Sequence, residues 1–246
     1  MRLKTSVESI LRFYPPLYRL GSRVYHRAHS EFRTLSPGAP GAIREAFEFT
    51  QVDPDALKFV GDYYEFGLFR GGTFLATSRI LDDMRLLDVR MYGFDSFQGL
   101  PPPAGVDASD PRFFEGQFAS SRADVEKNLA ERGMNMSRAD LIEGFYEDVL
   151  TENLHDKYPF QPASVVLFDC DYYSSTKVAM DWLTRYIRPG SVLLFDDWLS
   201  YGDSKELGQQ KALAEWLDKH PAFSVEYFND FQWHGRGFVV RIKDPV

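Results

Sequence analysis

Short apolar segments recur along most of the chain, and several of them end at an acidic residue. A buried strand of a parallel sheet is typically a run of about four to eight apolar residues bounded by turn residues. On this pattern we predict seven strands, at residues 62–66, 90–94, 140–143, 165–168, 191–195, 223–228 and 237–242.

Amphipathic segments separate these strands. Between residues 174 and 187, apolar side chains return at helical spacing before Pro189. We predict further helices at residues 71–81, 121–132, 147–153 and 204–219. The alternation predicts an α/β fold with a mostly parallel sheet and helices on both faces. The last two strands follow each other directly, so we expect a hairpin with one antiparallel strand at the sheet edge.

Two of the apolar runs end in paired acids. The run that ends at Phe168 is followed by Asp169 and Asp171, and a later run is followed by Asp196 and Asp197. If the two strands are neighbours, these carboxylates converge, and crowded carboxylates repel unless a cation or a proton joins them. Hard oxygen donors suit Mg²⁺ better than zinc. We therefore predict a metal site at the carboxyl end of the sheet, where open α/β folds bind ligands.

A glycine-rich turn links the first strand to the next helix. Its spacing, with Gly67 four residues before Gly71, differs from the Gly-x-Gly-x-x-Gly of dinucleotide folds. Glu65 at the strand end would repel phosphate but would accept an ammonium group or a ribose hydroxyl. Asp95, at the end of the second strand, is placed like the acids that accept hydrogen bonds from a ribose. These residues favour a nucleoside-type ligand with a positively charged amino-acid end.

Composition narrows the class of protein. The chain has 246 residues and a formal net charge of -8, which argues against non-specific nucleic-acid binding. The single cysteine excludes an intrachain disulfide and fits a reducing compartment. No apolar run approaches the roughly 20 residues of a membrane span. No apolar segment indicating a secretory signal follows the first residues, so we expect a cytoplasmic protein.

Residues 1–44 differ from the rest of the chain. Basic residues outnumber Glu8 and Glu31, aromatic residues are interleaved with them, and residues 36–41 (SPGAPG) have the composition of a loop. We predict a basic aromatic arm at residues 1–44 and a catalytic domain at residues 45–246. The arm is expected to pack on its own domain, to reach across a homo-oligomer or to contact an anionic membrane surface.

Five segments in the same order carry a family resemblance: EFGLFRGG (65–72), FDSFQGLP (94–101), EGFYEDVL (143–150), DCDYYSST (169–176) and DDW (196–198). They resemble the macrocin O-methyltransferase family over residues 63–198. The resemblance implies a Rossmann-like class I methyltransferase fold, S-adenosylmethionine as cofactor, Mg²⁺, and a sugar hydroxyl of a natural product as acceptor.

Carried over by position, the resemblance also implies roles for single residues. Asp169, Asp196 and Asp197 match the metal ligands. The cofactor-binding positions match Glu65, Gly67, Arg70, Gly71, Asp95, Ser96, Gly144, Phe145 and Tyr146. The mechanism, apart from the resemblance, predicts a catalytic set of Asp169, acting through the metal, and Asp171 or His234 as a base, with a metal-held hydroxide as a further alternative.

We therefore predict a Mg²⁺-dependent O-methyltransferase acting on a sugar or another vicinal-diol acceptor, a natural product or a saccharide. The loop at residues 99–118 is long and aromatic, so we expect it to cover the site. One alternative is a glycosyltransferase that uses Asp169-Cys170-Asp171 to hold a metal and a sugar nucleotide. Another is a non-catalytic scaffold of the same fold.

Overall fold

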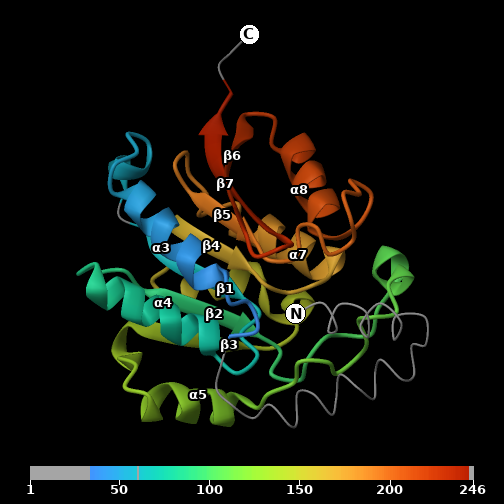
Figure 1. The fold of residues 1–246 in the computed structure, drawn as a ribbon, viewed down its shortest axis with the longest axis horizontal. Coiled ribbons are helices and arrows are strands. Elements are labelled where there is room, and N and C mark those ends of the chain that lie inside the picture. Colours follow the sequence, from blue (N-terminus) through green and yellow to red (C-terminus); the bar gives the residue numbers. More distant parts are fainter. Residues whose placement is uncertain (1–33, 60, 244–246) are drawn as a thin grey trace.

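The computed structural model describes residues 34–59 and 61–243 of the chain. A seven-stranded sheet runs through its centre in the order β3-β2-β1-β4-β5-β7-β6 (Figure 1). The strands are β1 (Asp62–Phe66), β2 (Met91–Asp95), β3 (Ala139–Glu143), β4 (Ala163–Phe168), β5 (Val192–Phe195), β6 (Phe223–Phe231) and β7 (Gly235–Ile242). The strands β1 to β5 pair in parallel, whereas β7 pairs antiparallel with both β5 and β6.

Helices cover both faces of this sheet. They are α3 (Ala39–Thr50), α4 (Gly72–Asp83), α5 (Arg122–Glu131), α6 (Tyr146–Val149), α7 (Tyr173–Leu183) and α8 (Gly208–Lys219). Short 3-10 helices lie between them: η1 (Ala56–Lys58), η2 (Gly105–Ser109), η3 (Met136–Arg138) and η4 (Glu152–Asp156). Alternate strand residues face opposite layers. In β4, Val165 and Leu167 pack with α3, α4 and α5, whereas Val166 and Phe168 pack with α6, α7 and α8.

The predicted fold class is confirmed, together with the antiparallel pairing at one side of the sheet. The hairpin inserts β7 between β5 and the outer strand β6. Helix α8 begins four residues later than its pattern predicts. The cause is Gly208, whose φ of +54° is left-handed and cannot continue a right-handed helix from residue 204.

The loop expected at residues 36–41 is partly wrong, because α3 begins at Ala39. Pro40 lies in the first turn of α3, where the missing N–H removes no helical hydrogen bond. Ala42, Ala46 and Phe47 of the helix are buried in the core, so the expected boundary between residues 44 and 45 falls inside a packed helix. Residues 1–33 of the predicted arm lie outside the described residues, and the division into arm and domain stays a prediction.

Across residues 34–59 and 61–243, no helix combines the length and the apolar character that a bilayer crossing requires.

Candidate active site

The register of the parallel strands brings the predicted acids together. Phe168 of β4 is the register partner of Phe195 of β5. The Asp169 N–H donates to the Phe66 carbonyl at 2.8 Å, and the Asp196 N–H donates to the Phe168 carbonyl at 2.9 Å. The ladder therefore extends one residue beyond each apolar run. Both acids stand at the carboxyl edge of adjacent strands, as the sequence predicts.

A serine hydroxyl lies between the first two carboxylates. Ser36 Oγ is 3.1 Å from Asp169 Oδ2 and 2.8 Å from Asp196 Oδ2. The other oxygen of Asp196 accepts from Gln232 Nε2 at 2.5 Å. Ser36 precedes α3 and Gln232 lies between β6 and β7, so segments from both ends of the domain meet at Asp196.

Asp171 and Asp197 are connected by a hydrogen bond, and a serine also binds Asp197. Ser200 Oγ donates to Asp197 Oδ1 at 2.9 Å, and the Asp171 N–H donates to Asp197 Oδ2 at 3.2 Å. Asp171 has a left-handed φ of +61°. A non-glycine residue in this conformation is uncommon and is often found at a functional site.

Burial changes the chemistry of all four carboxylates. Burial and then the charges of Asp196 and Asp197 hold the pKa of Asp169 well above its ordinary value. Burial also raises the pKa of Asp171 and Asp196, with the charge of Asp197 as the second cause in both. The pKa of Asp197 is raised as well, again by burial. Such a group requires protons or a cation to lower its repulsion.

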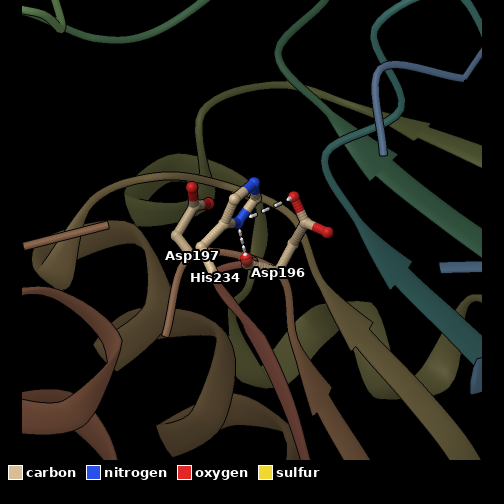
Figure 2. Close-up of side chains that lie close together, drawn as sticks. All are labelled: Asp196, Asp197 and His234. Carbon is tan, nitrogen blue, oxygen red and sulfur yellow. Dashed lines mark hydrogen bonds and ion pairs between the residues drawn. The ribbon is translucent and has the colours of Figure 1, made fainter. Parts of the chain in front are cut away.

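His234 lies next to these carboxylates, at the end of the turn between β6 and β7. Its Nδ1 contacts the backbone carbonyl of Asp196 and lies 3.9 Å from Asp196 Oδ2 (Figure 2). One ligand atom each from Asp196, Asp197 and His234 lie within 4.8 Å of one another. Since a carbonyl only accepts, Nδ1 must carry the proton, and the lone pair of the imidazole is on Nε2. Among the described residues, His234 thus lies beside Asp196 and Asp197 with Nε2 as its accepting nitrogen, while Ser36 connects Asp169 with Asp196.

A single cavity of about 380 Å³ connects these side chains with the glycine-rich turn. Predicted site residues that line it are Gly67, Arg70, Asp95, Ser96, Gly144, Phe145, Tyr146, Asp169, Asp171, Asp196, Asp197 and His234. Two others do not. Glu65 is buried, and Gly71 faces α5, where an added Cβ would lie 3.0 Å from Leu129.

The turn after β1 is shaped by close backbone packing. A Cβ on Gly67 would lie 1.8 Å from the carbonyl oxygen of Asp169, so only glycine fits. Asp95 Oδ2 accepts from the N–H groups of Leu68 and Phe69 at 2.7 and 3.0 Å. Asp95 therefore organises the turn, a role that sequence reasoning did not identify.

Glu65 lies under this turn with one oxygen satisfied. Tyr63 donates its hydroxyl to Glu65 Oε2 at 2.6 Å, whereas Oε1 has no partner among the described residues. Burial raises the pKa of Glu65 well above its ordinary value. A buried acceptor without a partner is costly, and a cationic ligand group would supply one.

The long loop after β2 lines the cavity through residues that include Leu100 and Phe113, and its expected role as a cover stays a prediction. Leu100 and Phe113 of this loop pack against Tyr172, which is fully buried. Asp107 fixes the loop to α7, because its carboxylate accepts from the N–H groups of Tyr173 and Ser174 at 2.8 and 3.1 Å. The loop is therefore docked at both an apolar and a polar contact.

Sequence reasoning missed Ser36, Gln232 and Ser200. None of them belongs to a motif, and the contacts of Ser36 and Gln232 with Asp196 cross 160 and 36 residues of chain. Trp233, exposed at the rim of the cavity next to His234, was also missed as a candidate. In the sequence, the position of this tryptophan next to the predicted base His234 was the available indication of a role in the site.

Comparisons with known proteins identify a family for the chain. The family model for macrocin O-methyltransferase (TylF) matches residues 48–219. The chain is 25% identical over 167 residues to mycinamicin III 3''-O-methyltransferase of Micromonospora griseorubida, which covers 65% of this chain and 61% of that protein. It is 27% identical over 144 residues to 8-demethyl-8-(2,3-dimethoxy-alpha-L-rhamnosyl)-tetracenomycin-C 4'-O-methyltransferase of Streptomyces olivaceus, covering 56% of this chain and 53% of that protein. The match thus spans less than two thirds of each relative's length.

The fold is shared with solved structures. The structure of the O-methyltransferase NovP superposes with a TM-score of 0.64 at 21% identity, covering 81% of this chain and 80% of that one. At this identity the likeness concerns the fold alone.

Proposed function

The chain belongs to the macrocin O-methyltransferase family, and from this premise we propose that it moves a methyl group from S-adenosylmethionine to a hydroxyl of a sugar, on a natural product or a saccharide. The name of one relative includes a rhamnosyl group and a 4'-O-methyl transfer, which supports a sugar acceptor. Family membership disfavours the glycosyltransferase and scaffold alternatives.

One observation carries this proposal. The same cavity is lined by the turn at Gly67, by the acids at the ends of β4 and β5, and by His234. A methyl donor on the turn and an acceptor near the acids would therefore share one enclosed space. Holding two reactants side by side lowers the entropic part of the barrier to reaction.

The turn suits the methionine end of the cofactor. The unpartnered Oε1 of buried Glu65 fits an ammonium group, which would restore the charged form of the carboxylate. Asp95 has lone pairs beyond those that bind the turn and is the proposed acceptor for the ribose. Gly144 and Phe145, at the end of β3, are proposed to line the adenine side of the site.

The acids suit a divalent cation. We assign Asp169, Asp196 and Asp197 as the residues that would hold Mg²⁺, whose charge would lower the pKa of the acceptor hydroxyl. Their raised pKa values mean that a cation lowers their repulsion more than it would between solvated acids. His234 donates through Nδ1, so its Nε2 is free to accept the hydroxyl proton. Asp171, which also lines the cavity, is the alternative base.

In the transfer, the acceptor oxygen forms a bond to the methyl carbon, and the carbon–sulfur bond breaks with its electron pair moving to sulfur. The hydroxyl proton goes to the base. General-base help of this kind is typically worth about 10²–10⁴-fold.

The experiment compares the wild-type chain with Asp196→Ala. Labelled S-adenosylmethionine and a panel of sugar acceptors, starting with rhamnosides, report transfer with and without EDTA. Calorimetric titration with S-adenosylhomocysteine reports cofactor binding. We expect Asp196→Ala and EDTA each to abolish transfer while S-adenosylhomocysteine still binds. The exposed Asp203→Ala serves as the control and should behave as wild type. Full activity in EDTA would reject the metal role. Failure of the wild type to bind S-adenosylhomocysteine would reject S-adenosylmethionine as the methyl donor.

A further inference from the structure

Among residues 34–59 and 61–243, Ser36 is the neutral side chain that hydrogen-bonds to two of the proposed metal ligands at once. It lies before α3, far in sequence from both acids, and only 3% of its surface is exposed. Its Oγ lies 3.1 Å from Asp169 Oδ2 and 2.8 Å from Asp196 Oδ2. Such burial beside two carboxylates indicates a specific position in the site.

The backbone around Ser36 is fixed on both sides. Two residues earlier, Thr34 Oγ1 lies 2.6 Å from Thr73 Oγ1 at the start of α4. Two residues later, the Gly38 N–H donates to Gln232 Oε1 at 3.3 Å, and an added Cβ on Gly38 would lie 2.8 Å from the Gln232 backbone nitrogen. The hydroxyl is therefore held in place from both directions.

When Asp169 and Asp196 are both ionised, as metal binding requires, hydrogen bonds alone do not account for the three oxygens. A serine hydroxyl carries one hydrogen and can donate it to one carboxylate at a time. The second close contact then joins two oxygens that need another positive centre between them. A divalent cation supplies that charge to all three oxygens together.

The spacing of the oxygens agrees with this. Mg²⁺ binds oxygen at about 2.1 Å in near-octahedral geometry, so adjacent ligands lie about 3.0 Å apart. The 2.8 and 3.1 Å separations around Ser36 Oγ fall on either side of this value.

We propose that Ser36 is a ligand of the divalent ion and supplies a neutral oxygen beside Asp169 and Asp196. This rests on the proposed metal-dependent function. It adds a ligand from outside the strand ends and makes the segment before α3 part of the metal site. A neutral donor adds a bond without adding to the charge of the carboxylates.

The test measures metal binding by calorimetry, with Mn²⁺ and Cd²⁺ titrated into the S-adenosylhomocysteine complex. The proteins are the wild type, Ser36→Ala, Ser36→Cys, the benchmark Asp196→Ala and the control Gly41→Cys. Loss of a group that supports a metal site typically costs about 10–100-fold in affinity, so we expect Ser36→Ala to lose at least about tenfold for Mn²⁺. A thiolate prefers a soft metal, so Ser36→Cys should gain affinity for Cd²⁺ while losing affinity for Mn²⁺.

Gly41→Cys places a thiol on exposed α3, where an added Cβ meets no atom within 4 Å, and should not gain Cd²⁺ affinity over wild type. The wild type itself carries buried Cys170 and sets the thiol background. Circular dichroism and melting curves check that each variant is folded.

Two outcomes overturn the proposal while leaving the metal role intact. In one, Ser36→Ala binds Mn²⁺ as tightly as wild type. In the other, Ser36→Cys loses Mn²⁺ and gains nothing for Cd²⁺, which would limit Ser36 to orienting the carboxylates. If wild type binds Mn²⁺ no better than Asp196→Ala, the metal role fails and the Ser36 assignment fails with it.

Discussion

Gln232 donates its side-chain N–H to the Asp196 carboxylate at 2.5 Å, from a turn in which its own backbone has a left-handed φ of +52°. The same amide accepts the Gly38 N–H through Oε1. A single side chain thus connects the β6–β7 turn, the end of β5 and the segment before α3.

Replacing Gln232 with Glu should disturb the site through charge. A second carboxylate next to Asp196 adds like-charge repulsion and removes the donated hydrogen bond. We expect a lower melting temperature for Gln232→Glu than for Gln232→Met, which loses the hydrogen bond alone. For a chain of this size, each kcal/mol of lost unfolding free energy lowers the melting temperature by about 2–4 °C. The difference between the variants should narrow as pH falls, because protonation relieves the repulsion. Equal melting temperatures at pH 8 would contradict this account.

Asp107 should stabilise α7 and the covering loop together. Tyr172, at the N-cap position of α7, makes no side-chain cap, and Asp107 takes that role from the loop. Loss of a helix cap typically costs about 0.5–2 kcal/mol. We expect Asp107→Ala to melt several degrees lower and its loop to be cut faster by protease, with Asp107→Asn intermediate. Calorimetry and timed proteolysis measure both effects. If Asp107→Ala lowers the melting temperature without changing the rate of loop cleavage, Asp107 caps α7 but does not hold the loop.

Trp233 should contribute to acceptor binding. The residue is 66% exposed and lines the cavity, and its ring centroid lies 4.4 Å from that of His234. An exposed indole beside the proposed base offers an apolar face to a sugar ring. We expect Trp233→Ala to raise the acceptor KM about fivefold, as loss of about 1 kcal/mol of aromatic contact implies, and to leave the S-adenosylmethionine KM unchanged. Trp233→Phe should retain most of the affinity. A fall in kcat alone, with KM constant, would argue against a binding role.

Asp62 should make stability depend on pH. Burial raises the pKa of Asp62 to about 6, against its ordinary value of 3.8. Between these values the native state keeps a proton that the unfolded state releases, so stability falls as pH rises from about 4 to 6, by up to about 3 kcal/mol. We expect Asp62→Asn to show a flatter pH dependence over this window. Urea unfolding at several pH values gives the slope, and exposed Asp88→Asn should keep the wild-type slope.

The sheet and the acids at its edge could be predicted because each depends on a short continuous segment of sequence. An apolar run such as residues 165–168 specifies a buried strand, and an acid directly after it must lie at the sheet edge. Parallel pairing of β4 and β5 then brings Asp169 and Asp196 together without further information.

What the sequence did not reveal depends on contacts between distant segments. Ser36 reaches its acids only after the chain has folded, and no local pattern records this contact. Helix α3 was not predicted, because Pro40 and its neighbouring glycines have loop composition, although proline at this place is compatible with a helix start.

The hairpin of β6 and β7 has a consequence for how this domain can diversify. Its turn carries Gln232, Trp233 and His234, while the glycine-rich turn is built by other strands. Adding or removing two residues on each arm would move the tip by about 7 Å and would carry Gln232 and His234 away from Asp196. The acids therefore fix the hairpin length, and evolution or design can vary the space for the molecule being modified through the exposed side chain at position 233 instead.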